Sequence, residues 1–275
     1  MSLTTPPTIQ SVYNGVPIGG CERKADTMIV LDHVTKTFGQ RIALHNVSIH
    51  FEAGQTHVLL GSSGCGKSTI LRMILGLLPP DSGEVRVNDT VVTVSTRALV
   101  TRSMGYVVQE GGLYPHLTAY RNVALAAEVQ KWPKQRIDAR VQELAEMVGF
   151  DAAILQHYPG QLSGGQRQRV GLIRSLVLDP PLLLFDEPLG ALDPVVRADL
   201  QGQLKAIFTT LRKTVVLVTH DIREAAIFGD TVTLMTAGRV VQRGTFADLA
   251  LRPADPFVTA FLQAQQLPPE MKAYF

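Results

Sequence analysis

The sequence has little of several features that mark large classes of protein. Its 275 residues contain only two cysteines, Cys21 and Cys65, which are too few for a disulfide framework and lack the CxxC spacing of a zinc site. It contains no uninterrupted apolar run of about 18 residues, the length that a membrane-spanning helix needs. Its formal net charge is +2, from 26 basic and 24 acidic residues, so nucleic acid is not its expected partner. These absences fit a chain of the reducing cytoplasm that does not form a path through a membrane by itself.

Strand-like and helix-like stretches alternate along the rest of the chain, whose hydrophobic fraction is 45%. Residues 29–38 alternate apolar and polar side chains, as a half-buried strand does. Residues 56–60 are short and nearly all apolar, which predicts a strand buried on both faces. The same pattern recurs at residues 182–185 and 215–218, each followed by polar residues and a helical pattern. We therefore expect an α/β core.

Two regions interrupt or close this core. Residues 112 to about 177 are mainly of helical pattern and predict an inserted helical subdomain, because Ile137, Val141 and Leu144 recur at helical spacing. A last hairpin is expected around residues 237–238. The start of the chain has neither the basic nor the apolar region of a secretory signal. The expected boundaries are residues 1–26 for a flexible tail, residues 27–265 for the folded domain and residues 266–275 for a C-terminal tail.

Residues 61–68 fit the phosphate-loop pattern G-x-x-x-x-G-K-[ST] between a buried strand and a helix. Backbone N–H groups of the glycine-rich turn and the helix N-terminus favour an anion, Lys67 reaches the β- and γ-phosphates, and Ser68 is a Mg²⁺ ligand. The helical pattern that follows continues to Leu78, before two prolines. The motif alone leaves open a kinase, a GTPase or a motor ATPase. The expected nucleotide-binding residues here are Gly61, Ser62, Ser63, Gly64, Cys65, Gly66, Lys67, Ser68 and Thr69.

Two acids end the buried strand at residues 182–185. Ligands of α/β proteins bind at the carboxyl edge of the sheet, so both acids are expected near the phosphates. Asp186 is the expected Mg²⁺ partner, directly or through water. Glu187 is then available to polarise an attacking water, a role that a kinase does not need. An acid pair after a strand is by itself commonplace, and the phosphate loop is what favours catalysis.

Residues 162–166 read LSGGQ and open a predicted helix near Gly165. Ser163 and the two glycines would form a second anion-receptive helix N-terminus, which one domain does not need for one nucleotide. Here the sequence resembles the ABC ATPase family, whose signature is this pentapeptide, and the resemblance extends from about residue 29 to 262. It implies a P-loop NTPase core of ABC type with an antiparallel β subdomain. It also implies ATP and Mg²⁺ as cofactors, and two copies paired head to tail around shared sites that include Ser163, Gly164, Gly165 and Gln166.

The resemblance also implies roles for four residues that have plainer structural interpretations on their own. Phe38 stands where an aromatic ring stacks on adenine, and Gln109 where a glutamine contacts the metal and the attacking water. Asp193 matches the dimer-contact loop. His220 matches the switch histidine that holds the γ-phosphate, which makes Glu187, His220 and Gln109 the expected catalytic residues and Ser68, Gln109 and Asp186 the expected metal ligands.

Among ABC proteins, an importer subunit is favoured, because non-transport members usually carry two cassettes or a long coiled coil. Residues 130–138, 185–197 and 218–226 look most like the importers of glycine betaine, choline and proline. This implies membrane permease subunits and a substrate-binding protein as partners, and a peripheral place on the cytoplasmic face of the inner membrane. An exporter or lipid-trafficking cassette stays open, and a ribosome or nucleic-acid factor is the more distant alternative. Co-purification with a membrane protein or with nucleic acid would separate these alternatives.

Overall fold

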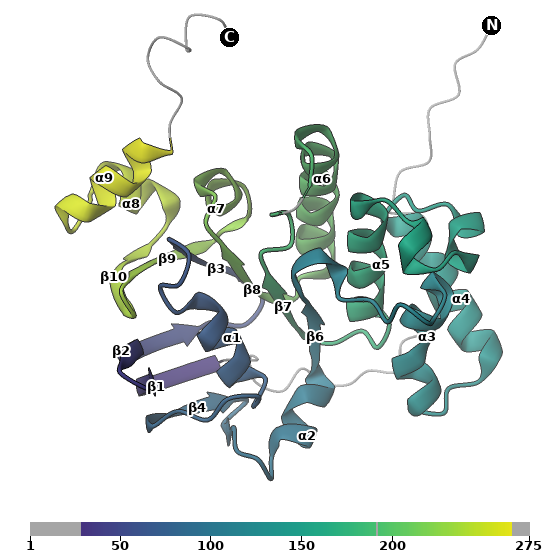
Figure 1. Cartoon of the computed structure of the whole chain (residues 1–275), viewed down its shortest axis with the longest axis horizontal. Helices are drawn as coiled ribbons and strands as arrows, with labels where there is room; N and C mark the ends of the chain where they lie inside the picture. The colour runs from purple at the N-terminus through teal and green to yellow at the C-terminus, as the bar shows by residue number, and fades with distance from the viewer. Residues whose placement is uncertain (1–28, 191, 266–275) are drawn as a thin grey trace, which may run out of the picture.

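The computed structural model describes residues 29–190 and 192–265 (Figure 1). The tails predicted at residues 1–26 and 266–275 lie outside the described residues. A six-stranded sheet forms the centre, a four-stranded antiparallel sheet lies beside it, and helices pack around both.

The small sheet has the order β2-β1-β4-β5 and forms because its strands alternate buried and exposed side chains. Ile29 and Leu31 of β1 and Ile49 and Phe51 of β2 are buried. Their shared face closes over the phosphate-loop helix, so this sheet covers one side of the central one. The strands are β1 (Ile29–Phe38), β2 (Arg41–Phe51), β4 (Ser82–Val87) and β5 (Thr90–Val91).

The central sheet has the order β10-β9-β3-β8-β7-β6, and every neighbouring pair is parallel except β9 and β10. All residues of β3 and β8 are buried, as the apolar stretches at 56–60 and 215–218 predict. The predicted last hairpin is also confirmed, as β9 and β10. The strands are β3 (Thr56–Gly61), β6 (Met104–Val107), β7 (Leu182–Asp186), β8 (Thr214–Thr219), β9 (Thr231–Thr236) and β10 (Arg239–Gly244).

Successive residues of the central strands point to opposite faces and fill two cores. Leu59 and Leu184 pack with the phosphate-loop helix and the small sheet. Val58 and Leu183 pack with helices on the other face. The central sheet is therefore packed on both faces.

The phosphate-loop helix α1 (Lys67–Ile74) is shorter than its apolar pattern predicts. The pattern continues to Leu78, but Gly76 adopts a φ of +65°, which no α-helix contains. The prediction was wrong by about one turn, because apolar periodicity continued beyond the helix into residues that still pack against the core.

Three helices between residues 119 and 176 lie together beyond β6, the edge strand of the central sheet (Figure 1). They are α3 (Ala119–Val129), α4 (Lys134–Met147) and α5 (Gly164–Leu176). Ile137, Val141 and Leu144 are buried, as their spacing predicts. Short 3-10 turns occupy Gln109–Gly111, Ala152–Gln156 and Pro159–Gln161. The remaining α-helices are α2 (Arg97–Val100), α6 (Pro194–Leu211), α7 (Ile222–Phe228), α8 (Phe246–Leu251) and α9 (Pro256–Ala264).

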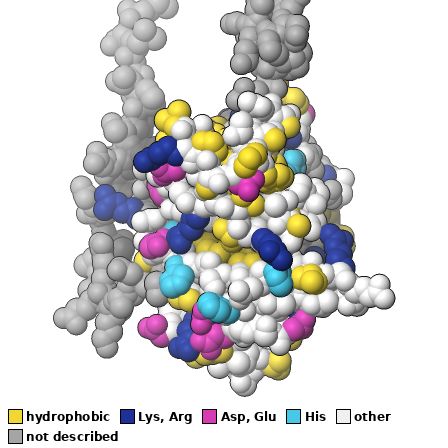
Figure 2. Space-filling view, turned by 90° about the vertical axis from the view of Figure 1, so that its left-hand side faces the viewer, with side chains coloured by type: hydrophobic (Ala, Val, Ile, Leu, Met, Phe, Trp, Pro, Cys, Tyr) yellow, Lys and Arg dark blue, Asp and Glu magenta, His cyan; other side chains and the backbone are white. Residues whose placement is uncertain are grey.

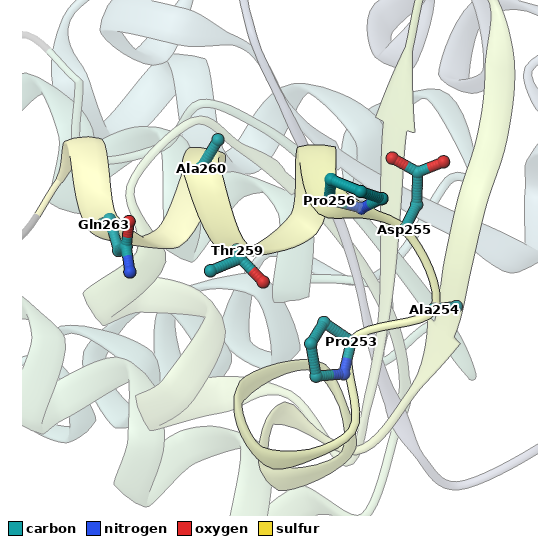
Figure 3. Close-up of a pocket in the computed structure, with 7 residues that line it drawn as sticks. All are labelled: Pro253, Ala254, Asp255, Pro256, Thr259, Ala260 and Gln263. Carbon is teal, nitrogen blue, oxygen red and sulfur yellow. The ribbon is translucent and has the colours of Figure 1, made fainter.

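The described helices and one face of the molecule bear on whether the chain has a membrane span or a strongly charged surface. None of its helices is long and apolar enough to cross a bilayer. On the face toward the small sheet, basic, acidic and histidine side chains are interspersed (Figure 2). A hollow of about 510 Å³ lies along α9, lined by residues 253–256 with Thr259, Ala260 and Gln263 (Figure 3). None of these residues belongs to the motifs identified above, so this hollow is not the predicted nucleotide site.

Candidate nucleotide-binding site

Parallel pairing brings four sequence motifs to one edge of the central sheet. The strands β3 and β8 are in register at Leu60 and Thr219, and β7 and β8 at Asp186 and Val218. Because β6 is parallel to β7, its carboxyl end also faces this edge. The phosphate loop, the acid pair, the histidine after β8 and the glutamine after β6 therefore follow neighbouring strand ends, where α/β proteins bind ligands.

The phosphate loop has backbone conformations and contacts that only glycine permits. Gly66, the N-cap of α1, has a φ of +110°, and a Cβ there would lie 2.6 Å from the carbonyl oxygen of Ala43. A Cβ on Gly61 would lie 2.3 Å from the carbonyl oxygen of Met235. No side chain caps the first turn of α1, so its N–H groups stay available for an anion.

Lys67 has a buried side chain that folds back over the loop. Only 4% of the residue is exposed, and Nζ donates to the carbonyl oxygens of Gly61 at 2.7 Å and Ser62 at 3.0 Å. Among the described residues, no carboxylate lies within ion-pair distance of this ammonium group. Its charge is stabilised by neutral groups and not by an acid, which leaves it ready to pair with phosphate oxygens.

Cys65 lies inside the loop but its side chain belongs to the core. It is 3% exposed and packs in the cluster beneath the small sheet, with Sγ 3.8 Å from Nζ of Lys67. A phosphate in the loop would therefore meet the backbone of Cys65 and not its thiol. From the outer side, Arg41 donates to the carbonyl oxygen of Gly64 at 2.9 Å.

Ser68 and Asp186 form the pair of oxygen ligands that a divalent cation would need. The Ser68 hydroxyl donates to Oδ1 of Asp186 at 2.8 Å. Burial raises the pKa of Asp186, the hydrogen bond from Ser68 opposes that shift, and the neighbouring Glu187 adds to it. An additional positive charge at this position would favour the carboxylate form, so the pair is electrostatically suited to a cation.

Glu187 and His220 meet directly beside that pair. Nδ1 of His220 lies 3.2 Å from Oε2 of Glu187, and the side chains are 53% and 21% exposed. Glu187 has a φ of +48°, an uncommon conformation for a residue other than glycine. Its N–H donates to the carbonyl oxygen of Val218 at 3.0 Å, which fixes the turn. Such strain is found disproportionately where a side chain must be aimed at a reacting group.

Gln109 and Phe38 lie at positions open to solvent. Gln109 is exposed and opens the 3-10 turn after β6. Phe38 ends β1 with 48% of its surface exposed, and Nζ of Lys36 lies 5.8 Å from its ring centroid. A large aromatic side chain at an exposed strand end is available for stacking, which its predicted adenine contact requires.

The signature residues are not joined to the phosphate loop of the same chain. The Ser163 hydroxyl accepts from the N–H of Gln166 at 3.2 Å, and the Gln166 side chain accepts from the N–H of Ser163 at 2.8 Å. This capping box starts α5. Gly165 is in close contact with α6, because a Cβ there would lie 2.5 Å from Cγ1 of Val196. Within residues 29–190 and 192–265, no hydrogen bond or ion pair connects residues 163–166 to residues 61–69.

Asp193 caps a helix in this chain. Its side chain accepts from the N–H groups of Val195 at 3.1 Å and Val196 at 3.0 Å, at the start of α6. The contact with a partner that the resemblance implies would be in addition to this capping role. The same first turn of α6 packs against Gly165, so the Asp193 loop and the signature are neighbours within one chain.

Two side chains near the site were not identified from the sequence. Burial, the charge of Asp186 and a hydrogen bond to it raise the pKa of Tyr106 to about 12, so this phenol stays protonated beside the expected metal ligand. Arg41 reaches the phosphate loop because it pairs with Phe38 across the β1–β2 turn. Strand pairing produces both contacts, and no local motif marks either residue.

Comparison with known proteins identifies the same family. Residues 44–190, more than half of the chain, match the ABC transporter family. The glycine betaine uptake system ATP-binding protein of Escherichia coli is 44% identical over 87% of this chain and 78% of its own length. The choline transport ATP-binding protein of Bacillus subtilis is 40% identical over 87% of this chain and 63% of its own length. A sulfate/thiosulfate import ATP-binding protein of Gloeobacter violaceus is also 44% identical, over 87% of this chain and 69% of its own length.

Solved structures agree. The dimeric post-hydrolysis state of the ATP-binding cassette MJ0796, bound to ADP and phosphate, superposes with a TM-score of 0.71 at 33% identity, over 79% of this chain and 98% of the cassette. The cassette of a Clostridium perfringens cbiONQ transporter gives 0.75 at 25% identity, over 87% of this chain and 97% of that one. The P-loop core of ABC type that the signature implies is confirmed. The chain belongs to the ABC transporter family and is an ATP-binding and ATP-hydrolysing subunit of its transporters.

Proposed function

We propose that this chain powers an importer of an osmoprotectant such as glycine betaine, choline or proline. The observation that carries the choice of cargo is the similarity to the glycine betaine and choline uptake proteins, which agrees with the osmoprotectant-like segments of the sequence. The chain spans only 63% of the choline relative, so cargo and partners are inferred through a shared ATPase domain and not through a whole protein.

Ser68, Asp186 and Gln109 are the proposed holders of Mg²⁺. Oxygen donors of this kind are what Mg²⁺ prefers, and the bond of 2.8 Å between Ser68 and Asp186 supports their role as neighbouring ligands. When bound, the ion would neutralise charge on the β- and γ-phosphates. The residues present therefore fit the ion.

The nucleotide is proposed to lie along the carboxyl edge of the sheet, with adenine on Phe38 and its phosphates in residues 61–69. Glu187 accepts a proton from the attacking water, a step for which its carboxylate is held by the turn after β7. His220 orients that carboxylate and contacts the γ-phosphate. Lys67 exchanges its backbone carbonyls for phosphate oxygens.

Two copies are proposed to share each site. Ser163 and Gly164 of one copy then face the phosphates held by the other, and Asp193 lies at the contact between copies. This arrangement explains why residues 163–166 do not reach the phosphate loop of their own chain. The similarity to a cassette solved as a dimer supports it.

Membrane permease subunits and a substrate-binding protein are the other proposed partners, with this chain on the cytoplasmic face of the inner membrane. The described residues contain no spanning helix, so a path for cargo would come from the permease. Nucleic acid is not proposed. The sulfate/thiosulfate relative favours a second candidate cargo, because its identity equals that of the glycine betaine relative.

Uptake in a deletion strain tests the cargo. In a host lacking other osmoprotectant systems, loss of the gene should abolish uptake of labelled glycine betaine or choline at high osmolarity. The wild-type gene should restore uptake and a Glu187→Gln gene should not. Unchanged uptake would reject the osmoprotectant assignment, and loss of sulfate uptake instead would select the second candidate. Either result leaves the ATPase assignment intact.

A further inference from the structure

Arg174 connects the signature helix to the loop that begins at Gln109. It lies in the last turn of α5, and its guanidinium reaches across to two consecutive backbone carbonyls. Nη1 donates to the carbonyl oxygen of Gly112 at 2.9 Å, and Nη2 donates to that of Gly111 at 2.8 Å. These distances are those of strong, charge-assisted hydrogen bonds.

Among the residues whose side chains the structure describes, which do not include Glu110, no carboxylate lies within ion-pair distance of the guanidinium. Burial lowers the pKa of Arg174, so its environment disfavours the charged form. Arg174 is half-buried, and a charge that is partly withdrawn from water is stabilised when polar groups surround it. Here the two carbonyls are its compensation, which makes both bonds important to the fold and to the position of the loop.

Backbone contacts show that the loop and the helix meet without intervening side chains. A Cβ on Gly171 of α5 would lie 3.0 Å from the Cα of Gly111. A Cβ on Gly105 of β6 would lie 2.3 Å from the carbonyl oxygen of Ser175. The strand before Gln109 and the turn after it therefore both lie directly against α5, and the arginine fork fixes the register of that contact.

We propose that Arg174 is a positioning residue for Gln109: it holds the Gln109 loop to α5, so that displacement of the signature end of the helix is passed to this glutamine. The helix is continuous from Gly164 to Leu176 and about 20 Å long, a stiff connection between its two ends. The inference rests on the proposed roles of Gln109 and Ser163. In a dimer with shared sites, Arg174 would couple the two nucleotide sites. The N-terminus of α5 would face the nucleotide held by the partner copy, whereas its C-terminal turn holds the Gln109 loop of its own chain's site.

Steady-state ATP hydrolysis tests this with a matched pair of arginine variants. Arg174→Ala should lower kcat about 10- to 100-fold while the KM for ATP stays within about threefold, because the nucleotide-binding residues are untouched. Arg174→Lys should recover part of kcat, since an ammonium keeps the charge and can donate to a carbonyl but lacks the rigid two-pronged geometry of the guanidinium. Arg140→Ala is the control. Arg140 lies on α4 and donates to the carbonyl oxygen of Leu176, at the end of α5, at 3.1 Å, without contacting the Gln109 loop. Its kcat should stay within about twofold of the wild-type value.

Amide hydrogen exchange provides the second measurement and does not depend on Gln109 being catalytic. In Arg174→Lys, protection of the amides of residues 111–113 should fall, while protection of α3 is retained. Wild-type kcat in Arg174→Ala, or equal losses of kcat and melting temperature in the Arg174→Ala and Arg140→Ala variants, would overturn the positioning role. Unchanged protection in Arg174→Lys would overturn it too, including where Arg174→Ala fails to fold. Gln109→Ala is assayed in parallel. If Gln109 has no role in hydrolysis, this variant keeps the wild-type turnover, which separates a failure of the proposed role of Gln109 from a failure of the positioning role of Arg174.

Discussion

The two helix N-termini that we propose to bind phosphate differ in how their amides are satisfied. At α1 the N-cap is Gly66 with no side-chain cap, and the ammonium of Lys67 rests on backbone carbonyls. At α5 the cap is complete, because Ser163 and Gln166 bond to each other's backbone. The phosphate loop is therefore open to a ligand as it stands, whereas under the proposed shared site Ser163 would divide its hydroxyl between its own helix and a phosphate.

The N-termini of α1 and α5 therefore differ in which other groups of the same chain lie beside them. The open terminus lies at an edge where Ser68, Asp186, Glu187 and His220 are already within hydrogen-bond or ion-pair distance of one another in pairs. Among the residues that the structure describes, no carboxylate or histidine forms a hydrogen bond or ion pair with residues 163–166. A cap that holds the helix together without a ligand suits a surface that meets its nucleotide only when a second copy arrives.

The largest expected effect lies at the open terminus. Glu187→Gln should slow ATP hydrolysis by about 10²- to 10⁴-fold while MgATP binding persists, because the amide keeps the size of the side chain and its place beside His220 but cannot accept a proton. Single-turnover hydrolysis and equilibrium binding measure the two quantities. Wild-type turnover would remove Glu187 from the mechanism.

The signature glycines provide a sharper test of the capped terminus. Gly165→Ala should lower the free energy of unfolding by about 1–3 kcal/mol, because the added Cβ would lie 2.5 Å from Cγ1 of Val196. Gly164→Ala is the matched control, since its Cβ would make only an ordinary contact, at 3.7 Å from Leu192. Denaturant unfolding of both variants without nucleotide is the measurement. Equal stability would mean that Gly165 is not required by packing within the chain.

A smaller effect follows from the raised pKa of Asp186. The Asp186 carboxyl binds its proton more tightly in the folded chain than in the unfolded chain. Ionising this buried carboxyl therefore lowers the stability of the fold: the loss is absent below the unfolded-state pKa and grows as pH rises through the folded-state pKa. Asp186→Asn removes it and should raise the melting temperature of the nucleotide-free protein at pH 7. The gain should vanish near pH 3, below the ordinary range of an aspartate pKa, which lies at about 3.9. A variant that melts lower at pH 7 would show that burial does not strain this carboxylate.

The sequence predicts best where one strand or one helix determines the structure. The stretches at 56–60, 182–185 and 215–218 are buried strands because they are apolar on both faces, and pairing them in parallel brings Lys67, Asp186 and His220 to one edge. The helix that opens at the signature is also found, with Ser163 as its cap. These features depend on local composition, which a reader of the sequence can see.

Features that depend on packing between distant segments were not predictable in this way. The contact of Arg174 with Gly111 and Gly112 joins residues more than 60 positions apart, and no local pattern marks it. The left-handed backbone of Glu187 follows from its bond to Val218 on the next strand. The end of α1 was misplaced for the same reason, since residues beyond it keep their apolar pattern to fill the core and not to extend the helix.

The central claim, that two copies share each site, is tested most directly with a tagged heterodimer. One chain carries Lys67→Ala and the other Ser163→Arg, so shared sites place both lesions in one site and leave the other built from intact parts. We predict one occluded nucleotide per heterodimer, measured by trapping labelled ATP rather than by turnover, because hydrolysis can require both sites. Homodimers of either variant should trap none. A folded, paired heterodimer that traps no nucleotide would contradict the shared site and show that each chain depends on its own signature.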